Sequence, residues 1–188
     1  MTPRVPIFVC GEPARGDDAA GFAAVELLPP GLLDRVDVVA AGQLDLLLLL
    51  DLPAGSPCVV VDAVAGLRPG EVWVRPLATL VDRARAAGSG GPAAGSGGRG
   101  PGSGGRAPGN GGRGPEPRSS HELPLEQVLA LAATLREAPP AGTFVGIGGS
   151  CWDVGAGLTP AVAAALPAFA AAIAAAVDEL SGGLTPAG

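Results

Sequence analysis

Short apolar runs alternate along the chain with longer segments of helical periodicity. Five runs have the length and composition of strands: 5–10, 36–41, 58–61, 71–75 and 143–147. Four longer segments predict helices: 17–28, 44–52, 124–137 and 160–180. The order βαβαββαβα is typical of a mostly parallel sheet covered by helices. We therefore expect an α/β fold, a three-layer αβα sandwich around a mostly parallel, twisted sheet of about five strands with helices on both faces.

Turn and cap residues separate these elements. The first helix is expected to stop at the Pro-Pro-Gly sequence 29–31, because proline interrupts a helix. Pro160 follows Thr159, which predicts a helix start with Thr159 as its N-cap and proline in the first position.

Residues 86–118 differ abruptly from the rest of the chain. The segment consists mostly of Gly, Pro, Ser, Ala and Arg, and it contains a short repeat, RGPGSGG followed by RAPGNGG. It has no large apolar residue, so burial cannot offset the entropy of ordering it. We expect a disordered loop inserted into a single domain formed by residues 1–85 and 119–188. The alternative is that its arginines meet an acidic partner.

Composition and charge exclude several kinds of chemistry. All 12 basic residues are Arg, and the absence of Lys excludes a Schiff-base enzyme or a P-loop. The net charge is −6, and outside the insert 8 basic residues face 17 acidic ones. This acidic balance, with only two Trp and four Phe, argues against a nucleic-acid partner.

The cysteines and the termini favour a cytoplasmic protein. Cys10, Cys58 and Cys151 show no CxxC spacing, so we expect reduced thiols rather than a disulfide framework or a zinc finger. The N-terminus lacks the pattern of a signal peptide. The apolar run 161–177 is interrupted by Pro167, so we interpret it as an amphipathic core helix and expect no membrane partner.

Three groups of polar residues are expected at the carboxyl edge of the sheet, where open α/β folds bind ligands. Asp17 and Asp18 follow the first strand, Asp62 ends the third, and His121 precedes a helix. Two carboxylates and one imidazole on three loops predict a three-ligand metal site with open positions.

Other interpretations of these residues stay open. Asp17 and Asp18 could complement the dipole of the first helix. Asp62 could cap a turn, and His121 could be a surface residue. A catalytic thiol, Cys10 or Cys151 paired with His121, is a further possibility.

Five segments follow one another along the chain: GEPARGDDAAG (11–21), VVVDAV (59–64), PGEVWV (69–74), SSHELPLEQVLALA (119–132) and VGIGGSCWDVGAGLTPAVAAALP (145–167). Together they resemble the hydrogenase maturation endopeptidases, small proteins that trim the large subunits of nickel–iron hydrogenases. The resemblance covers nearly all of the chain outside the insert.

The resemblance implies roles for three residues. Asp18 matches the second acid of the family's glycine-rich turn, Asp62 its strand-end aspartate, and His121 its pre-helical histidine. These three are therefore expected to be the metal-binding and catalytic residues, with nickel supplied by the substrate. The resemblance further implies a cytoplasmic α/β protein, expected to be a monomer, that cleaves the C-terminal extension from the precursor of a hydrogenase large subunit.

The chain departs from the family pattern in its turns. Val9, Glu12 and Ala19 replace a Gly, an Asn and a Gly of the first turn, and Gln43 lies in an altered second turn. Glu12 could be an additional carboxylate that acts as a general base, or a turn residue that faces solvent. These changes leave open an alternative function, that of a non-proteolytic protein of the same fold that senses metal or binds the precursor.

Overall fold

The computed structural model describes residues 4–89, 118–119 and 124–182. Its sheet has the strand order β2-β1-β3-β6-β4, and the short β5 pairs with β3 outside this path. Strands β2, β1, β3 and β6 run parallel, whereas β4 and β5 pair antiparallel with β6 and β3. The strands are β1 (Val5–Cys10), β2 (Val36–Gly42), β3 (Cys58–Ala65), β4 (Val72–Pro76), β5 (Arg118–Ser119) and β6 (Gly142–Gly148).

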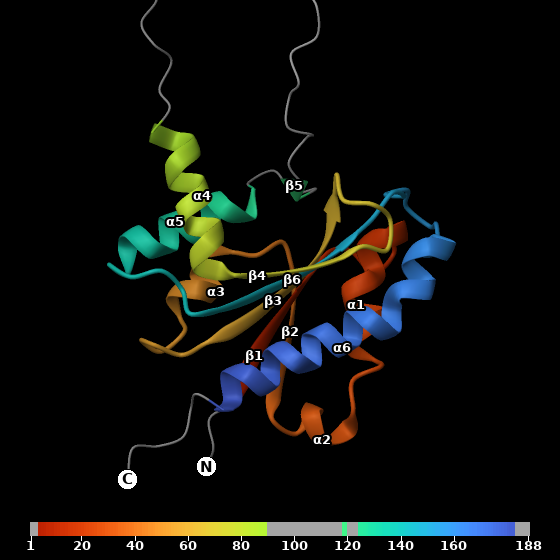
Figure 1. The fold of residues 1–188 in the computed structure, drawn as a ribbon, viewed down its shortest axis with the longest axis horizontal. Helices are drawn as coiled ribbons and strands as arrows, with labels where there is room; N and C mark the ends of the chain where they lie inside the picture. Colours follow the sequence, from red (N-terminus) through yellow and green to blue (C-terminus); the bar gives the residue numbers. More distant parts are fainter. Residues whose placement is uncertain (1–3, 90–117, 120–123, 183–188) are drawn as a thin grey trace, which may run out of the picture.

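Helices cover both faces of this sheet (Figure 1). The helical elements are η1 (Gly16–Ala19), α1 (Ala20–Val25), α2 (Pro30–Leu33), α3 (Leu46–Leu50), α4 (Leu77–Ser89), α5 (Leu125–Leu135) and α6 (Pro160–Gly182). Helices α1 and α6 lie on one face, and α3, α4 and α5 lie on the other (Figure 1). The architecture confirms the expected three-layer α/β sandwich.

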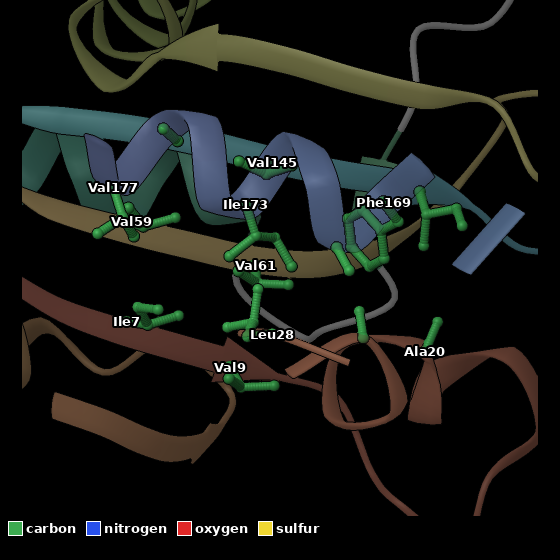
Figure 2. Close-up of a cluster of buried hydrophobic side chains, with 14 of the residues drawn as sticks. Ile7, Val9, Ala20, Leu28, Val59, Val61, Val145, Phe169, Ile173 and Val177 are labelled. Atoms are coloured by element: carbon green, nitrogen blue, oxygen red, sulfur yellow. The ribbon is translucent and has the colours of Figure 1, made fainter. Parts of the chain in front are cut away.

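Alternate residues of each strand supply the two halves of the core. On the α6 side, Val59, Val61 and Val145 meet Phe169 and Ile173 of α6 (Figure 2). The intervening strand residues face the other helices, with α4 and α5 packed over them. The central strands are therefore apolar at nearly every position, because both of their faces are covered.

Helix α6 is long and apolar enough to cross a membrane by length and composition. In the structure, however, Phe169, Ile173 and Val177 point into the core (Figure 2) and are fully buried, as is Val162 in the same cluster. This arrangement confirms the interpretation of the segment as an amphipathic core helix.

Helix α4 was not expected from the sequence. It extends through Ser89 and so includes the first residues of the predicted insert, whose last residue, Arg118, belongs to β5. Among residues 77–87, the part of α4 whose burial the structure describes, only Leu77, Leu80 and Val81 are buried, and this stripe is too short to indicate a helix among the surrounding Ala and Arg residues. Packing against α5 completes the helix. The predicted disorder of residues 90–117 lies outside the described residues.

Three other elements differ from their predicted limits. The region 17–28 divides into η1 and α1, and α3 is shorter than the predicted helix 44–52. Strand β3 continues four residues beyond the predicted end at Val61, because its pairing with β6 runs on through Val64↔Gly148. The expectation that Asp62 ends this strand is therefore wrong, since Asp62 lies within β3, opposite Gly146.

Candidate functional site

Asp62 comes next to the last residue of β1 although it lies within β3. The two strands are paired up to Val9↔Val61, and β1 ends at Cys10, so Cys10 and Asp62 occupy the following step. Side chains at paired positions of parallel strands point to the same face. Asp62 is only 1% exposed, so its carboxylate is enclosed beside the end of β1.

A tight turn after β1 brings Asp18 back over the strand end. Gly11 has φ of 108°, and a Cβ there would lie 2.2 Å from the backbone oxygen of Asp18, so only glycine fits. The backbone N–H of Glu12 donates to Asp18 Oδ2 over 3.1 Å. Asp18 Oδ1 is buried and has no hydrogen-bond partner among the described residues. Such an oxygen is costly unless a ligand satisfies it.

The neighbouring carboxylate, Asp17, is fully satisfied. Its Oδ2 accepts hydrogen bonds from the backbone N–H groups of Ser150 and Cys151, at 2.8 and 3.1 Å, and from Thr159 Oγ1 at 3.0 Å. Its Oδ1 accepts from the Thr159 N–H at 2.7 Å. Burial alone would raise the pKa of Asp17, but these hydrogen bonds outweigh it and lower that pKa.

These contacts decide one open alternative and refine the expected start of α6, which begins at Pro160 directly after Thr159 as predicted. Asp17 does not act merely on a helix dipole, because it ties the turn after β1 to the loop that joins β6 to α6. Thr159 directs its hydroxyl to Asp17 and not to the first turn of α6. Only the Thr159 carbonyl takes part in the helix start, where it accepts from the Ala163 N–H.

Cys10 lies within the electrostatic reach of both candidate carboxylates. Burial raises the pKa of its thiol well above the ordinary value, and the charges of Asp62 and Asp18 raise it further, against a hydrogen bond from the Leu44 backbone. A thiol held protonated in this way is a poor nucleophile. Burial likewise raises the pKa of Cys58, at the other end of β3, to about 12. These environments argue against a catalytic role for either thiol.

His121 lies outside the described residues, so the predicted Asp18–Asp62–His121 site stays a prediction. The described residues on either side of it reach β3 close to Asp62. Ser119 pairs with Val64, and Leu125, the first residue of α5, lines a small hollow together with Asp62. Within residues 4–89, 118–119 and 124–182, no group of three His, Cys, Asp or Glu side chains forms a metal site.

The other candidate residues lie at the margin of this region. Glu12 is exposed, and its Oε1 accepts only from the nearby Ala14 N–H, at 3.4 Å. This position agrees with a turn residue that faces solvent. Cys151 is half-buried in the loop after β6. Neither side chain has the enclosure of Asp18 and Asp62.

An apolar groove of about 510 Å³, which the sequence patterns did not reveal, opens between the start of α3 and α5. Its lining is mainly apolar with a few polar groups: Gln43, Leu44, Asp45, Leu46, Gln127, Val128 and Leu131. Leu44 connects the groove to the strand ends, because it belongs to the same buried cluster as Cys10. The only sequence signal for the groove is the leucine-rich segment 44–52, which has more leucines than the core requires. On the other side of the groove, Leu131 of α5 is 49% exposed.

Comparison with known proteins identifies the fold. The structure is similar to the nickel–iron hydrogenase maturation protease HybD from Thermococcus kodakarensis, with a TM-score of 0.58, 22% identity, and coverage of 89% of this chain and 95% of that one. For the hydrogenase maturating endopeptidase HybD from E. coli, the TM-score is 0.60, the identity 19%, and the coverage 94% and 93%.

A hydrogenase 2 maturation peptidase from a Thaumarchaeota archaeon gives a TM-score of 0.53 at 20% identity, with coverage of 93% and 97%. No known family profile matches the sequence, and no curated protein is similar to it in sequence. The solved structures that this chain resembles are thus hydrogenase maturation proteases, matched over nearly their whole length.

Proposed function

We propose that this protein is an endopeptidase of hydrogenase maturation, which removes the C-terminal extension from the precursor of a nickel–iron hydrogenase large subunit. The observation that carries the proposal is a pair of enclosed carboxylates, Asp18 and Asp62, beside the end of β1 in a fold shared with maturation proteases. A buried carboxylate oxygen without a hydrogen-bond partner among the described residues, such as Asp18 Oδ1, is costly unless a ligand satisfies it.

The donor set suits a metal ion that arrives with the substrate. Asp18 Oδ1 is a buried anionic oxygen without a hydrogen-bond partner among the described residues. Such an oxygen is available to bind a cation. Asp18 and Asp62, with His121 as the third ligand from the sequence resemblance, would bind nickel already inserted in the precursor. Carboxylate and imidazole together are a suitable set for a divalent transition metal.

Nickel recognition would restrict cleavage to precursors that have received their metal. The chemistry that a bound divalent ion supplies is Lewis-acid polarisation of a carbonyl or of water. The protein contributes enclosure and charge, since Asp18 and Asp62 bring two carboxylates able to bind a cation or accept a proton. The turn fixed by Gly11 and Asp17 holds Asp18 in place for either task.

The groove offers space for a polypeptide on the face of the sheet that carries Asp62. Its volume of about 510 Å³ is in the range of sites that bind small ligands or short peptide segments. We propose that it accepts the part of the precursor that flanks the cleaved bond.

The test is intact-mass spectrometry of a nickel-loaded large-subunit precursor from the same genome, mixed with about a tenth of an equivalent of this protein. We expect the loss of one C-terminal peptide with nickel, and no loss from the metal-free precursor. Asp18→Asn and Asp62→Asn should reduce the rate roughly 10²- to 10³-fold, and His121→Ala should also reduce it.

Asp34→Asn is the matched control, because Asp34 is an exposed carboxylate at the end of α2 and should leave the rate unchanged. An unchanged precursor mass together with a stoichiometric complex would favour the non-proteolytic alternative. Cleavage that proceeds equally without nickel would contradict the proposed recognition of the metal.

A further inference from the structure

Two arginines stack on one indole close to the candidate site. Trp73 lies on the edge strand β4, and its ring meets Phe144 edge-on, with 5.9 Å between centroids. The guanidinium carbon of Arg75 lies 4.8 Å from the centre of the Trp73 ring, and that of Arg83 lies 5.5 Å from it. Both distances are within the range of cation–π contact. The indole thus holds two positive charges together on β4 and α4.

The indole that holds this pair lies beside one of the candidate carboxylates. Trp73 and Asp62 line the same small hollow, together with Leu80 and Leu125. The indole therefore links the two exposed guanidinium groups to the region where the proposed peptide cleavage takes place. A substrate segment that lies against Trp73 would therefore be close both to the arginines and to the hollow that Asp62 lines.

Neither guanidinium is neutralised by an acid in the part of the chain that the structure describes. The two ion pairs found there are Arg4–Asp37 and Arg35–Asp178. Glu126 lines the hollow and Asp82 precedes Arg83, but neither approaches an arginine within ion-pair distance. Arg75 donates one N–H to the backbone oxygen of Val74. The remaining N–H groups form a donor surface, in a protein that is otherwise strongly acidic.

Two guanidinium groups kept together by one ring repel each other unless an anion lies between or across them. The planar fork of Arg matches a carboxylate, which it binds with two parallel hydrogen bonds. The ligands that a peptidase meets offer this group in two forms, as an acidic side chain or as the free C-terminus of the polypeptide.

We propose that Arg75 and Arg83, stacked on Trp73, form a carboxylate-binding site that anchors the substrate polypeptide beside Asp62. The inference rests on the proposed peptidase function and adds a charge requirement to it. The segment released from the precursor, or the chain next to it, must present a carboxylate to this pair.

The experiment uses the full-length protein and a fluorescently labelled peptide with the sequence of the precursor's C-terminal extension. Fluorescence anisotropy measures its dissociation constant. In the Arg75→Gln/Arg83→Gln variant we expect binding to weaken about ten- to a hundredfold, the usual loss for charge-assisted hydrogen bonds. Arg85→Gln is the matched control, because Arg85 is an exposed arginine of the same helix without a ring contact. It should change binding by less than about twofold.

Two modified peptides distinguish the sources of the carboxylate. In the first peptide an amide replaces the C-terminal carboxylate. If this amide binds the unmodified protein as weakly as the free acid binds the double variant, the terminal carboxylate is the group that the arginines bind. The same loss on replacing acidic side chains by their amides would identify those side chains. Arg75→Lys/Arg83→Lys should bind with intermediate strength, since lysine keeps the charge but loses the fork.

Cleavage assays separate this inference from the proposed function. If the double variant raises KM by the same factor by which it weakens peptide binding, and leaves kcat nearly unchanged, the arginine site and the peptidase function are both supported. If the double variant cleaves the precursor with the same KM as the Arg85→Gln control, the arginine site is overturned and the proposed peptidase function stands. Peptide binding that depends on both arginines, without any cleavage of nickel-loaded precursor, would support the site and contradict the peptidase. Absence of peptide binding to the unmodified protein would overturn the inference.

Discussion

One face of the sheet is covered by α1 and α6 over a closed apolar cluster. On the other face, α3, α4 and α5 cover a second apolar cluster that includes Cys10, and they leave an apolar groove open. The first face contains Phe169 and Ile173, which are completely buried, whereas the second presents Leu131 at 49% exposure. Both faces use the same residue types. Both layers therefore contain fully buried side chains, and the layer opposite α6 also borders Asp62 and the groove.

The strongest test of this contrast is a cavity in the α6 layer. Phe169→Ala should lower the free energy of unfolding by about 3–5 kcal/mol, because the ring is fully buried and its space cannot collapse completely. Leu131→Ala, on the opposite face, should cost less than about 1 kcal/mol, since half of that side chain is already exposed. Urea denaturation of both variants measures the difference. Equal losses would show that the side chain of Leu131 contributes as much to stability as that of Phe169.

A second comparison contrasts the adjacent carboxylates Asp17 and Asp18 in their effects on stability. Asp17→Asn should cost about 2–3 kcal/mol of stability, because its amide group would face N–H donors that now bind a carboxylate. Asp18→Asn should leave stability within about 1 kcal/mol, since it removes a buried charge with an unpaired oxygen.

Thermal or urea unfolding, run beside the cleavage assay, distinguishes the two variants. We expect Asp17→Asn to be the less stable protein and Asp18→Asn to be the folded but inactive one. A strongly destabilised Asp18→Asn protein would mean that this carboxylate is structural like its neighbour.

The groove predicts a smaller effect on substrate binding. Leu131→Glu should raise KM for the precursor about tenfold with little change in kcat, because it places a charge in an apolar lining. Leu135→Glu is the matched control, since Leu135 is exposed on the same helix but does not line the groove. Steady-state cleavage rates measure both constants. An identical KM for the two variants would argue against substrate contact in the groove.

The smallest predicted effect concerns the decrease in the free energy of unfolding at acidic pH. The pKa of Asp17 is lowered in the folded protein, so its contribution is present above the unfolded value of about 4. That contribution is lost as the pH falls through the folded pKa. Urea unfolding between about pH 6 and pH 3 should show a steeper loss for the unmodified protein than for Asp17→Asn. If the free energies of unfolding of the two proteins fall in parallel with pH, other carboxylates dominate the loss of stability at acidic pH.

Local pattern was sufficient for most of the fold. Strands β1, β2 and β6 begin and end within one residue of their predicted limits, because continuous apolar runs bounded by turn residues have few other low-energy arrangements. Helix α4 was missed because its apolar stripe becomes stable only against α5. The end of β3 was misplaced because the alignment with β6, and not the sequence of β3 alone, determines how far pairing continues.

The candidate site divides in the same way. The sequence placed Asp17, Asp18 and Asp62 near the carboxyl edge of a parallel sheet, and the fold confirms that region. Residue patterns alone did not separate the functions of Asp17 and Asp18, and only the family resemblance singled out Asp18. The partners of Asp17 lie up to 142 positions away in the chain, beyond the reach of any local pattern.

The sequence by itself determined the alternation of strands and helices, the α/β class and the acidic character of the protein, because these depend on composition and on repeats of a few residues. Only the tertiary structure decided that Asp17 is satisfied by the loop before α6, that Asp18 retains an unpaired oxygen, and that Arg75 and Arg83 share one indole. These properties depend on distances between segments that are remote in the chain, and such distances are fixed only when the layers pack.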